Sequence, residues 1–433
     1  MDFHKKGWLK QYIQTRNHHA LHREFTRITA IKASDERPEQ VLYNIIQPTG
    51  LLYGYPTQLP YEYKGLLRAV NMDKLPVQHK NKIILLESLL YSAVTSTRYQ
   101  HLENEVDVAD AFLEAAHRVG TYYKSMYKDL DTKYKSLFFY RERKGMDLTE
   151  HILDSRTNYE SKEGRFWTVF INSSLLFVDV LFFHQWIAAS SSAEEQQRIA
   201  QQHEKMRWQL LKTMVVAAYA NETIEKEEER LVSYYLEAAL FSEELRAESM
   251  KLLDRGLSMD DLNTEEVESP VLKKYLLELA VLVVSADNII TASEETFIDQ
   301  FCEKLALPHQ EAEGSILTVE SFMYAHWQSI GYARHREEPD ALRQHLLDRL
   351  KRIGTSYHRE LRTIIQKDEE LLQLLQSARQ DNLRTDERKD LRQQLLEVLT
   401  QLPVFTPNTL PVSFLTYSVL LEILPHDIEI ASN

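Results

Sequence analysis

The chain has 433 residues, and its acidic residues outnumber its basic ones by 65 to 51, which gives a net charge of −14. Gly (11) and Pro (12) are each far below the average usage of about 7% and 5%. Because sheet-rich folds need frequent Gly and Pro turns, this shortage predicts an all-α, multi-helical fold with no significant sheet. The single cysteine, Cys302, excludes an intrachain disulfide framework and a cysteine-rich zinc site.

Residues 1–160 are predicted to form an N-terminal helical domain with one irregular loop at 47–63. That loop packs three prolines, two glycines and four tyrosines into 17 residues, a composition that no helix tolerates. The first 80 residues carry 12 basic and 7 acidic residues. Such an excess can contact phospholipid or RNA, but it is small, and a solvated helical surface is the favoured explanation. Residues 1–10 contain no apolar signal-peptide core, so we expect a cytoplasmic protein.

The segment Val169–Ala189 is long and apolar enough to be tested as a membrane span. It contains Asp179, together with Asn172, His184 and Gln185. A carboxylate in the middle of a membrane helix costs about 2.5 to 3.5 kcal/mol on insertion scales. We therefore expect a buried core helix.

The stretch Tyr122–Lys144 interleaves aromatic residues with seven Lys/Arg. Such a pattern can stack on and neutralise a nucleic acid. Amphipathic packing with the lysines facing water explains the pattern equally well, and no RNA-binding motif is present. Nucleic acid is therefore not an expected partner.

Two central segments, Ala217–Phe241 and Val283–Leu307, align without a gap at an offset of 66 residues. Each reads as an apolar helix, a short polar break and a second helix opened by acids, which suit the positive end of the helix dipole. We expect two helical hairpins that bury each other's apolar faces. Equivalent positions include Ala220 and Ala286, Asn221 and Asp287, Ile224 and Ile290, and the pairs Glu228–Glu229 and Glu294–Glu295.

The second of these segments resembles the tellurite-resistance TerB-like helical domain. Ala286-Asp287-Asn288-Ile289-Ile290 followed by Glu294-Glu295 keeps that family's pattern except for one glycine. The first segment departs further, because Ala220–Ile224 lacks both the aspartate and the glycine. The resemblance implies a TerB-like region with two related hairpins, which we place at 165–312.

The C-terminal part, residues 330–433, is predicted to begin with two amphipathic helices within Tyr357–Leu402, separated by a polar break. Thr385 is the expected cap of the second helix, with Asp386 and Glu387 in its first turn. The apolar stripes consist of Leu361, Ile364, Ile365, Leu371, Leu372 and Leu375 in the first helix, and of Leu391, Leu395, Val398, Leu399 and Leu402 in the second.

This C-terminal part resembles the LETM family, the leucine-zipper, EF-hand transmembrane proteins of mitochondria. The matching residues are Leu383, Glu387 and Arg388, then Leu402-Pro403-Val404-Phe405 and Leu421-Glu422-Ile423-Leu424-Pro425. The overall layout resembles a bacterial LETM-related group that is labelled biofilm-associated. Unlike the membrane span of the LETM family, the apolar segment here is interrupted by Thr406–Thr409.

The apolar run Leu410–Leu424 is too short to span a bilayer. We predict that it is helical from about Pro411 and packs against Leu391, Leu395 and Leu399. Its apolar face consists of Phe414, Leu415, Val419, Leu420, Ile423 and Leu424, with Ser418 and Glu422 on the other side. The alternative is an interfacial anchor with that face in contact with lipid.

Four residue groups have the composition of chemical sites, and each has a structural explanation. His18 and His22 lie at i, i+4 with His19 adjacent, and Glu114 and His117 have the Glu-x-x-His spacing of di-iron bundles in a single copy. Asp287, Glu294 and Glu295 could bind a divalent cation but lack the spacing of an EF-hand loop. Cys302 falls mid-helix, as expected of a core residue.

No catalytic, cofactor-binding or metal-binding residue is assigned from the sequence. We expect a non-enzymatic cytoplasmic scaffold or adaptor that binds a protein partner. Peripheral contact with the inner face of the membrane is left open. One alternative is a divalent-cation-responsive regulator of the TerB-like type. The other is a component of a LETM-like membrane cation-exchange system.

Overall fold

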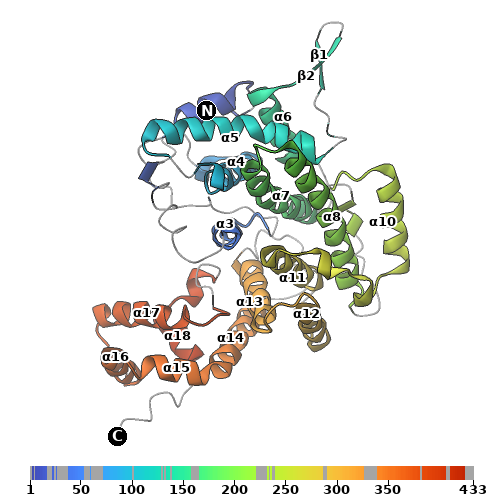
Figure 1. The fold of residues 1–433 in the computed structure, drawn as a ribbon. Helices are drawn as coiled ribbons and strands as arrows, with labels where there is room; N and C mark the ends of the chain where they lie inside the picture. The colour runs from blue at the N-terminus through green and yellow to red at the C-terminus, as the bar shows by residue number, and fades with distance from the viewer. Residues whose placement is uncertain are drawn as a thin grey trace. The chain divides into compact units, whose positions relative to one another are not determined.

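A computed structural model of the chain is all-α apart from one short hairpin, as its low glycine and proline content predicts (Figure 1). It describes residues 2–3, 5–16, 22–23, 26, 38–52, 59, 72–99, 102–127, 130, 133–136, 139–157, 165–220, 232–233, 235–236, 239–285, 290–325, 339–380, 383–405 and 410–424. Of the loop predicted at 47–63, the structure describes 47–52 and 59, and the 3-10 helix η1 (Gln47–Thr49) lies there.

The chain divides into two compact units. Unit 1 comprises Met1–Val216 and Glu229–Leu262, and unit 2 comprises Ala217–Glu228 and Asn263–Asn433. One boundary between the units therefore falls after Leu262, inside the region 165–312 that the sequence pattern treats as one. The apolar helix beginning at residue 165 packs against helices of the N-terminal region.

Unit 1 is built around two helices that have no solvent-exposed face in their central parts. Residues 81–94 of α4 and 175–184 of α7 are all buried, and α4 packs against α5, α6 and α7. The expectation of a buried core helix at Val169–Ala189 is confirmed for residues 175–184. The helices of this unit are α1 (Trp8–Gln14), α3 (Pro38–Ile46), α4 (Val77–Val94), α5 (Glu105–Met126), α6 (Gly145–Thr157), α7 (Arg165–Ala188), α8 (Ala193–Ala218, of which the last two residues fall in unit 2) and α10 (Glu243–Arg255), with short 3-10 helices η2 (Met72–Lys74), η3 (Thr97–Tyr99) and η4 (Met259–Asp261).

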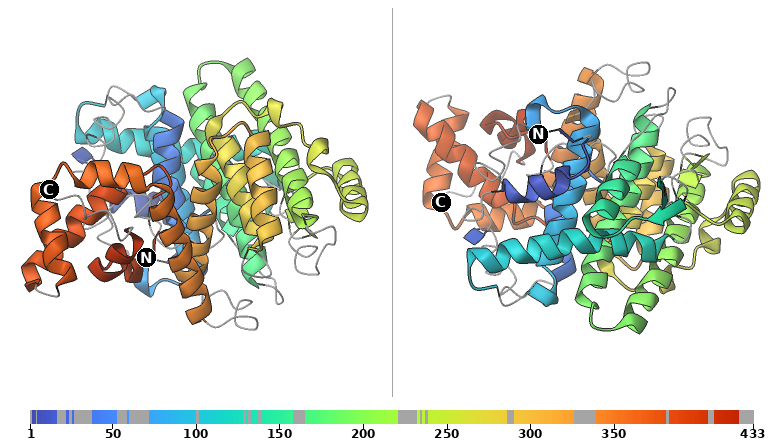
Figure 2. Two further views of the ribbon diagram at one scale, coloured as in Figure 1. Left: turned by 90° about the horizontal axis from the view of Figure 1, so that it is seen from below. Right: turned by 90° about the horizontal axis from the view of Figure 1, so that it is seen from above.

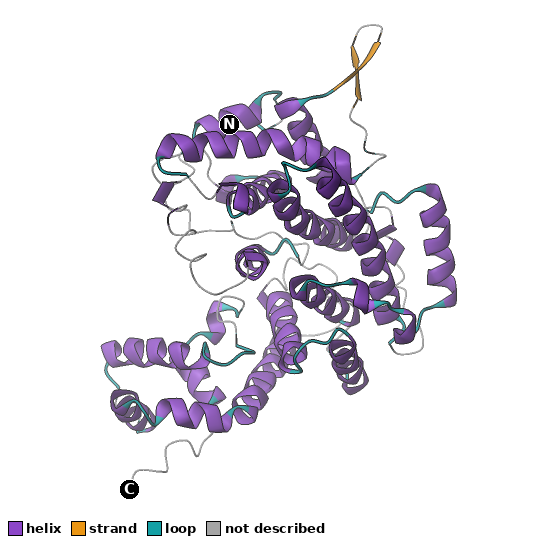
Figure 3. Ribbon diagram, viewed as in Figure 1, coloured by secondary structure: helices purple, strands orange, loops and turns teal. Residues whose placement is uncertain are grey.

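The stretch Tyr122–Lys144 is not one amphipathic helix. Its first part completes α5, where Tyr122 and Tyr123 are buried. The next part forms an antiparallel hairpin of β1 (Lys133–Ser136) and β2 (Phe139–Glu142), which is the only sheet among the described residues (Figure 3). The stretch is therefore helical up to Met126 and forms strands at 133–136 and 139–142.

Unit 2 begins with three helices that lie side by side, α11, α12 and α13 (Figure 2). The helix ending at Val284 and the helix beginning at Ala292, which has acids in its first turn, agree with the hairpin predicted at Val283–Leu307, of which residues 286–289 lie outside the described part. Ile290 is buried beside the break. The elements of this unit are η5 (Thr264–Glu266), α11 (Pro270–Val284), α12 (Ala292–Lys304), α13 (Gln310–Ala325), α14 (Pro339–Ser356), α15 (His358–Ile365), α16 (Glu369–Arg379), α17 (Thr385–Leu399), η7 (Val412–Phe414) and α18 (Tyr417–Ile423).

The first C-terminal amphipathic helix is in fact two helices, α15 and α16. The helix is interrupted at Gln366–Asp368. The Asp368 carboxylate accepts a hydrogen bond from the Leu371 N–H at 3.0 Å, and this bond caps α16. The predicted cap of the next helix is also off by one residue. Thr385 is the first residue of α17, and the Arg384 N–H donates instead to the Glu387 carboxylate at 2.8 Å.

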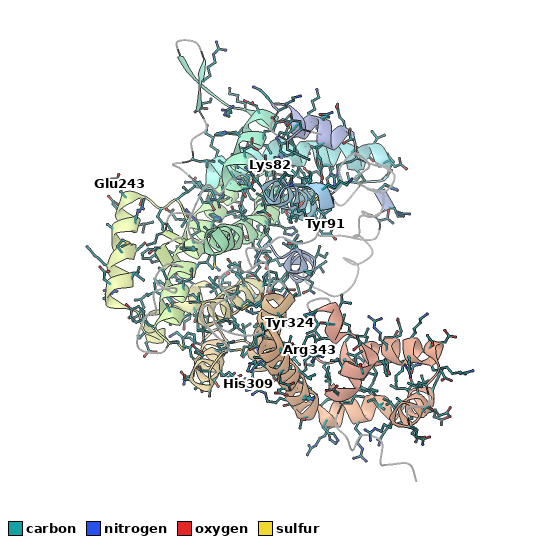
Figure 4. All side chains as sticks on the ribbon, turned by 180° about the vertical axis from the view of Figure 1, so that it is seen from behind. Lys82, Tyr91, Glu243, His309, Tyr324 and Arg343 are labelled. Carbon is teal, nitrogen blue, oxygen red and sulfur yellow. The ribbon has the colours of Figure 1, made fainter. Side chains whose placement is uncertain are left out.

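The apolar run Leu410–Leu424 packs into the core of unit 2, as predicted. Its buried residues belong to one cluster with Leu391, Leu395 and Leu399, whereas Ser418 and Glu422 are exposed. The Phe414 ring lies 5.4 Å from that of Tyr324 and 5.7 Å from the Arg343 guanidinium carbon (Figure 4). The helix does not begin at Pro411, however, because Thr416 caps α18 and Pro411 precedes η7. The alternative of a lipid-facing anchor fails because its apolar face is already covered.

Gly354 lets α14 and α18 approach each other closely. A Cβ atom at Gly354 would lie 1.9 Å from the Ile423 carbonyl oxygen, which is backbone and cannot rotate away. We predict that Gly354→Ala separates the two helices and lowers the melting temperature, despite the higher helix propensity of alanine. Gly314 in α13 is the matched control, since its Cβ would meet nothing closer than 3.6 Å. Gly314→Ala should be neutral or stabilise by up to about 1 kcal/mol, and equal effects of both variants in thermal melts would contradict this account.

Candidate functional site

A fully buried carboxylate, Asp179, gathers polar groups from four helical segments of unit 1. Its Oδ1 accepts hydrogen bonds from the Tyr127 hydroxyl at 2.7 Å and from His203 Nε2 at 2.9 Å. Its Oδ2 lies 3.1 Å from an Arg156 nitrogen. These groups come from the end of α5 and from α6, α7 and α8, so a single carboxylate joins four parts of the chain. We call Tyr127, Arg156, Asp179 and His203 the Asp179 network.

The charge states in the Asp179 network follow from its burial. Burial by itself raises the pKa of Asp179, but the Arg156 guanidinium and the hydrogen bonds from His203 and Tyr127 bring it below its ordinary value. Burial lowers the pKa of His203, and the bond to Asp179 offsets this only in part. The network therefore holds an ionised Asp179 beside a neutral His203 that donates through Nε2. His203 Nδ1 has no hydrogen-bond partner among the described residues, which suits a neutral ring, because a proton there would be a buried, unsatisfied donor.

Aromatic rings enclose the cations of the Asp179 network. The guanidinium carbon of Arg156 lies 4.9 Å from the Tyr127 ring centroid, and that of Arg207 lies 4.6 Å from the same ring. Arg207 also donates to the Ala239 carbonyl, which anchors the segment that follows α8. All of these groups are buried, so the network supports the core of unit 1 and presents no reactive group to solvent.

A second charge cluster holds residues 2–16 against the helices of unit 1. The buried Glu87 carboxylate accepts from the Tyr12 hydroxyl and from Arg16, each at 2.6 Å. Glu150 accepts from two backbone N–H groups at the start of α1, each at 2.9 Å. Lys82, itself buried, pairs with Asp154. The seven-residue α1 is thus stabilised by groups of α4 and α6 rather than by its own length.

A third cluster, in unit 2, takes up one of the candidate cation ligands. Arg349 pairs with Glu320 at 2.7 Å and with Glu295 at 2.8 Å, and His345 lies 3.2 Å from Glu320. Burial raises the pKa of Glu320, but His345 and Arg349 bring it below its ordinary value. The neighbouring Glu294 accepts from the Thr291 N–H at 2.7 Å in a capping box. Helix capping and ion pairing therefore engage these two acids, and Asp287 lies outside the described residues.

The other candidate residues also have structural partners or lie outside the description. Glu114 pairs with Arg98 at 2.6 Å and with Arg118 at 2.9 Å, whereas His117 is exposed. His18 and His19 are outside the described residues. Cys302 is fully buried, and burial raises the pKa of its thiol to about 11, which confirms a core residue. Within the described residues, no three His, Cys, Asp or Glu side chains are grouped so that they could hold a metal ion.

One accessible feature of the described surface is an apolar stripe on α5. Val106 is 67% exposed and Leu113 is 36% exposed, although both side chains are large and apolar. The two residues are seven positions apart, and the half-buried Ala109 lies between them, so the three share one helix face. The exposed acid Asp110 lies in the same helix, next to Ala109 in sequence, and the exposed Glu103 precedes the helix. We call Val106, Ala109 and Leu113 the α5 stripe.

Comparison with known proteins gives one match. Residues 164–314 match the model of a family described as "Protein of unknown function (DUF533)". The match covers about a third of the chain, from the start of α7 into α13, and its range nearly coincides with the region 165–312 predicted from the sequence. No curated protein and no solved structure is similar enough to the chain to count as a match. The DUF533 match assigns no activity.

Sequence reasoning found Asp179 but not its role. The sequence shows Asp179 as the one carboxylate in an apolar run, and the cost of placing a carboxylate in a bilayer argues against a membrane span there. Among the described residues no helix has the length and apolar character needed to cross a bilayer, in agreement with that reasoning. The partners Tyr127, Arg156 and His203 lie 52, 23 and 24 positions away from Asp179 in the chain, so no local sequence motif predicts them.

Removing the Asp179 carboxylate is predicted to destabilise the protein strongly, because the buried Arg156 would lose the carboxylate that balances its charge. We expect Asp179→Leu to cost about 3 to 5 kcal/mol. The double variant Asp179→Leu/Arg156→Met removes both charges and should be more stable than Asp179→Leu alone. Thermal unfolding followed by circular dichroism measures both. Additive losses in the double variant would show that the pair is not coupled.

His203 is predicted to make the folded state lose stability between pH 7 and pH 5. Because the pKa of His203 is lowered in the folded state, the unfolded chain takes up the proton first as the pH falls below about 6.5. The stability that neutral His203 contributes is complete above that value and decreases toward pH 5. Asp179 does not contribute to this change, since its lowered pKa places its effect at more acidic pH.

The test replaces the ring by a neutral donor. The melting temperature of His203→Gln should fall less between pH 7 and pH 5 than that of the unchanged protein. His117→Gln, at an exposed histidine of the same unit, is the control and should keep the original pH dependence. A His203→Gln variant with the original slope would show that His203 is not the titrating group.

Proposed function

We propose that the protein is a non-enzymatic scaffold or adaptor that binds a protein partner through the α5 stripe. The observation that carries the proposal is the exposure of Val106 and Leu113 on one face of a helix whose opposite face is built into the core of unit 1. Because this helix is already ordered in the free protein, binding a partner to its apolar side chains costs little conformational entropy on this side of the interface. Contiguous exposed apolar groups mark interaction sites in soluble proteins.

The buried charges of the protein support a structural rather than a chemical role. The three charge clusters described above each join several segments of the chain, and their ionised groups are engaged with one another. Their burial gives them no access to a substrate. The accessible groups on α5 include the apolar side chains of Val106 and Leu113, which favours binding of a partner.

The chemistry of the α5 stripe defines the partner. Val106 and Leu113 require apolar side chains opposite them, at a spacing of two helical turns. Asp110 in the same helix and Glu103 just before it are exposed acids, which favour Lys or Arg in the partner. We therefore propose an amphipathic helix with a basic edge as the segment that docks here.

The alternative of a cation-responsive regulator is less well supported. Glu295 would have to release Arg349 and Arg352, and Glu294 would have to leave its capping box, before either could bind a metal ion. Contact of Leu410–Leu424 with a membrane would require the disruption of a packed core.

The proposal is tested by affinity isolation from the native cell with paired variants. Val106→Glu/Leu113→Glu replaces two exposed side chains, so we expect its melting temperature to remain unchanged and its protein partner to be lost. Met250→Glu on α10 is the control, because Met250 is 45% exposed and lies away from α5 in sequence and structure (Figure 1). A partner retained by the double variant, or lost equally in the control, would refute docking at the α5 stripe.

A further inference from the structure

The α5 stripe belongs to an exposed face that runs along the whole of α5. Six of the seven exposed residues of this helix recur at intervals of three or four positions, and they are Val106, Asp110, Leu113, His117, Thr121 and Lys124. With 3.6 residues per turn, these six positions lie within about 60° of one another around the helix axis. The helix therefore presents one straight, narrow face to solvent.

The charge of this face changes sign along its length. Asp110 lies in the first half of α5, and the exposed Glu103 precedes the helix. The second half carries His117 and Lys124. Lys124 also pairs with Glu142 at 3.0 Å, and both side chains stay 48% exposed. A face that is acidic at one end and basic at the other is complementary to a copy of itself that runs in the opposite direction.

An antiparallel pair of α5 helices gives each charged residue a partner of the other kind. In a two-fold symmetric pair, positions at equal distances on either side of the axis face each other. With the axis between positions 113 and 114, Leu113 of one copy meets Leu113 of the other at the centre. Asp110 then faces His117 of the second copy, and Glu103 faces Lys124 of the second copy. Symmetry makes each of these contacts twice.

We propose that the α5 stripe docks on α5 of a second copy of this chain, in antiparallel orientation. This inference rests on the proposed function, which calls for an amphipathic helix with a basic edge, and it identifies that helix. The helix α5 meets the description, because its exposed face combines Val106 and Leu113 with the basic residues His117 and Lys124. A parallel pair would set Asp110 against Asp110, so the charges favour the antiparallel arrangement.

The first measurement is the mass of the full chain in sedimentation equilibrium, from low to high micromolar concentration. A contact between two helices is small beside the about 1,200–2,000 Å² that stable complexes bury, so we expect a reversible monomer–dimer equilibrium. Val106→Glu/Leu113→Glu places acids at the centre of the contact and should leave the chain monomeric at every concentration.

The second measurement tests the antiparallel pairing by exchanging charges. Asp110→Lys and His117→Glu should each weaken dimerisation about tenfold, because each removes two symmetric contacts and sets like groups against each other. The double variant Asp110→Lys/His117→Glu should dimerise as the unchanged protein does. An equimolar mixture of the two single variants should also restore the dimer, since the mixed pair again sets a basic residue against an acid on both sides of the axis.

The matched controls are Glu248→Lys and Lys251→Glu on α10, which make the same kinds of charge change at exposed positions of the same unit. Neither control should alter dimerisation. Melting curves of all variants, taken at low concentration where the unchanged protein is monomeric, should coincide, which establishes that the fold is intact.

Three results would overturn the proposal. The first is a chain that is monomeric at every concentration. The second is a dimer that persists in Val106→Glu/Leu113→Glu. The third is a mixture of the two single variants that dimerises no better than either variant alone. A monomeric chain that still loses a different protein in affinity isolation with Val106→Glu/Leu113→Glu would overturn self-pairing and leave the scaffold proposal in place, so the two proposals can fail separately.

Discussion

Unit 1 depends on keeping one carboxylate ionised in the absence of water. Asp179 lies in the middle of an apolar helix, where an isolated charge would cost far more free energy than any single contact supplies. The carboxylate is tolerated because an arginine, a tyrosine and a histidine from other segments converge on it. This requirement fixes how α6, α7, α8 and the end of α5 must meet. An alternative packing of the same helices would leave Asp179 or Arg156 buried and unpaired.

The same principle recurs in the other parts of the protein. Glu87 and Glu150 hold the N-terminal segment against unit 1, and Glu320 with Arg349 joins α13 to α14 in unit 2. Apolar burial drives the collapse of each unit but is not directional. Buried charge pairs discriminate between arrangements, because a mismatched pair costs several kcal/mol. We regard these three clusters as the elements that select one packing of a largely helical chain.

The buried charges stabilise the fold, whereas the surface features are available for binding. The charged groups inside the protein have their partners within it, whereas the α5 stripe is accessible. An accessible apolar stripe on a helix whose opposite face is buried is consistent with the proposed role of an adaptor. The DUF533 match neither favours nor opposes this interpretation.

The sequence by itself determined the all-α class, the buried helix at α7, the hairpin of α11 and α12, and the packing of Leu410–Leu424, because each follows from local composition and periodicity. Tertiary structure alone decided the partners of Asp179, the break between α15 and α16, and the hairpin within 122–144. The partners of a buried charge depend on which helices pack together. Residues 23 to 52 positions apart share no local sequence pattern that would predict their contact. The break at Gln366–Asp368 and the strands at 133–142 override helical periodicity, because a side-chain cap at Asp368 and cross-strand pairing satisfy the backbone there in another way.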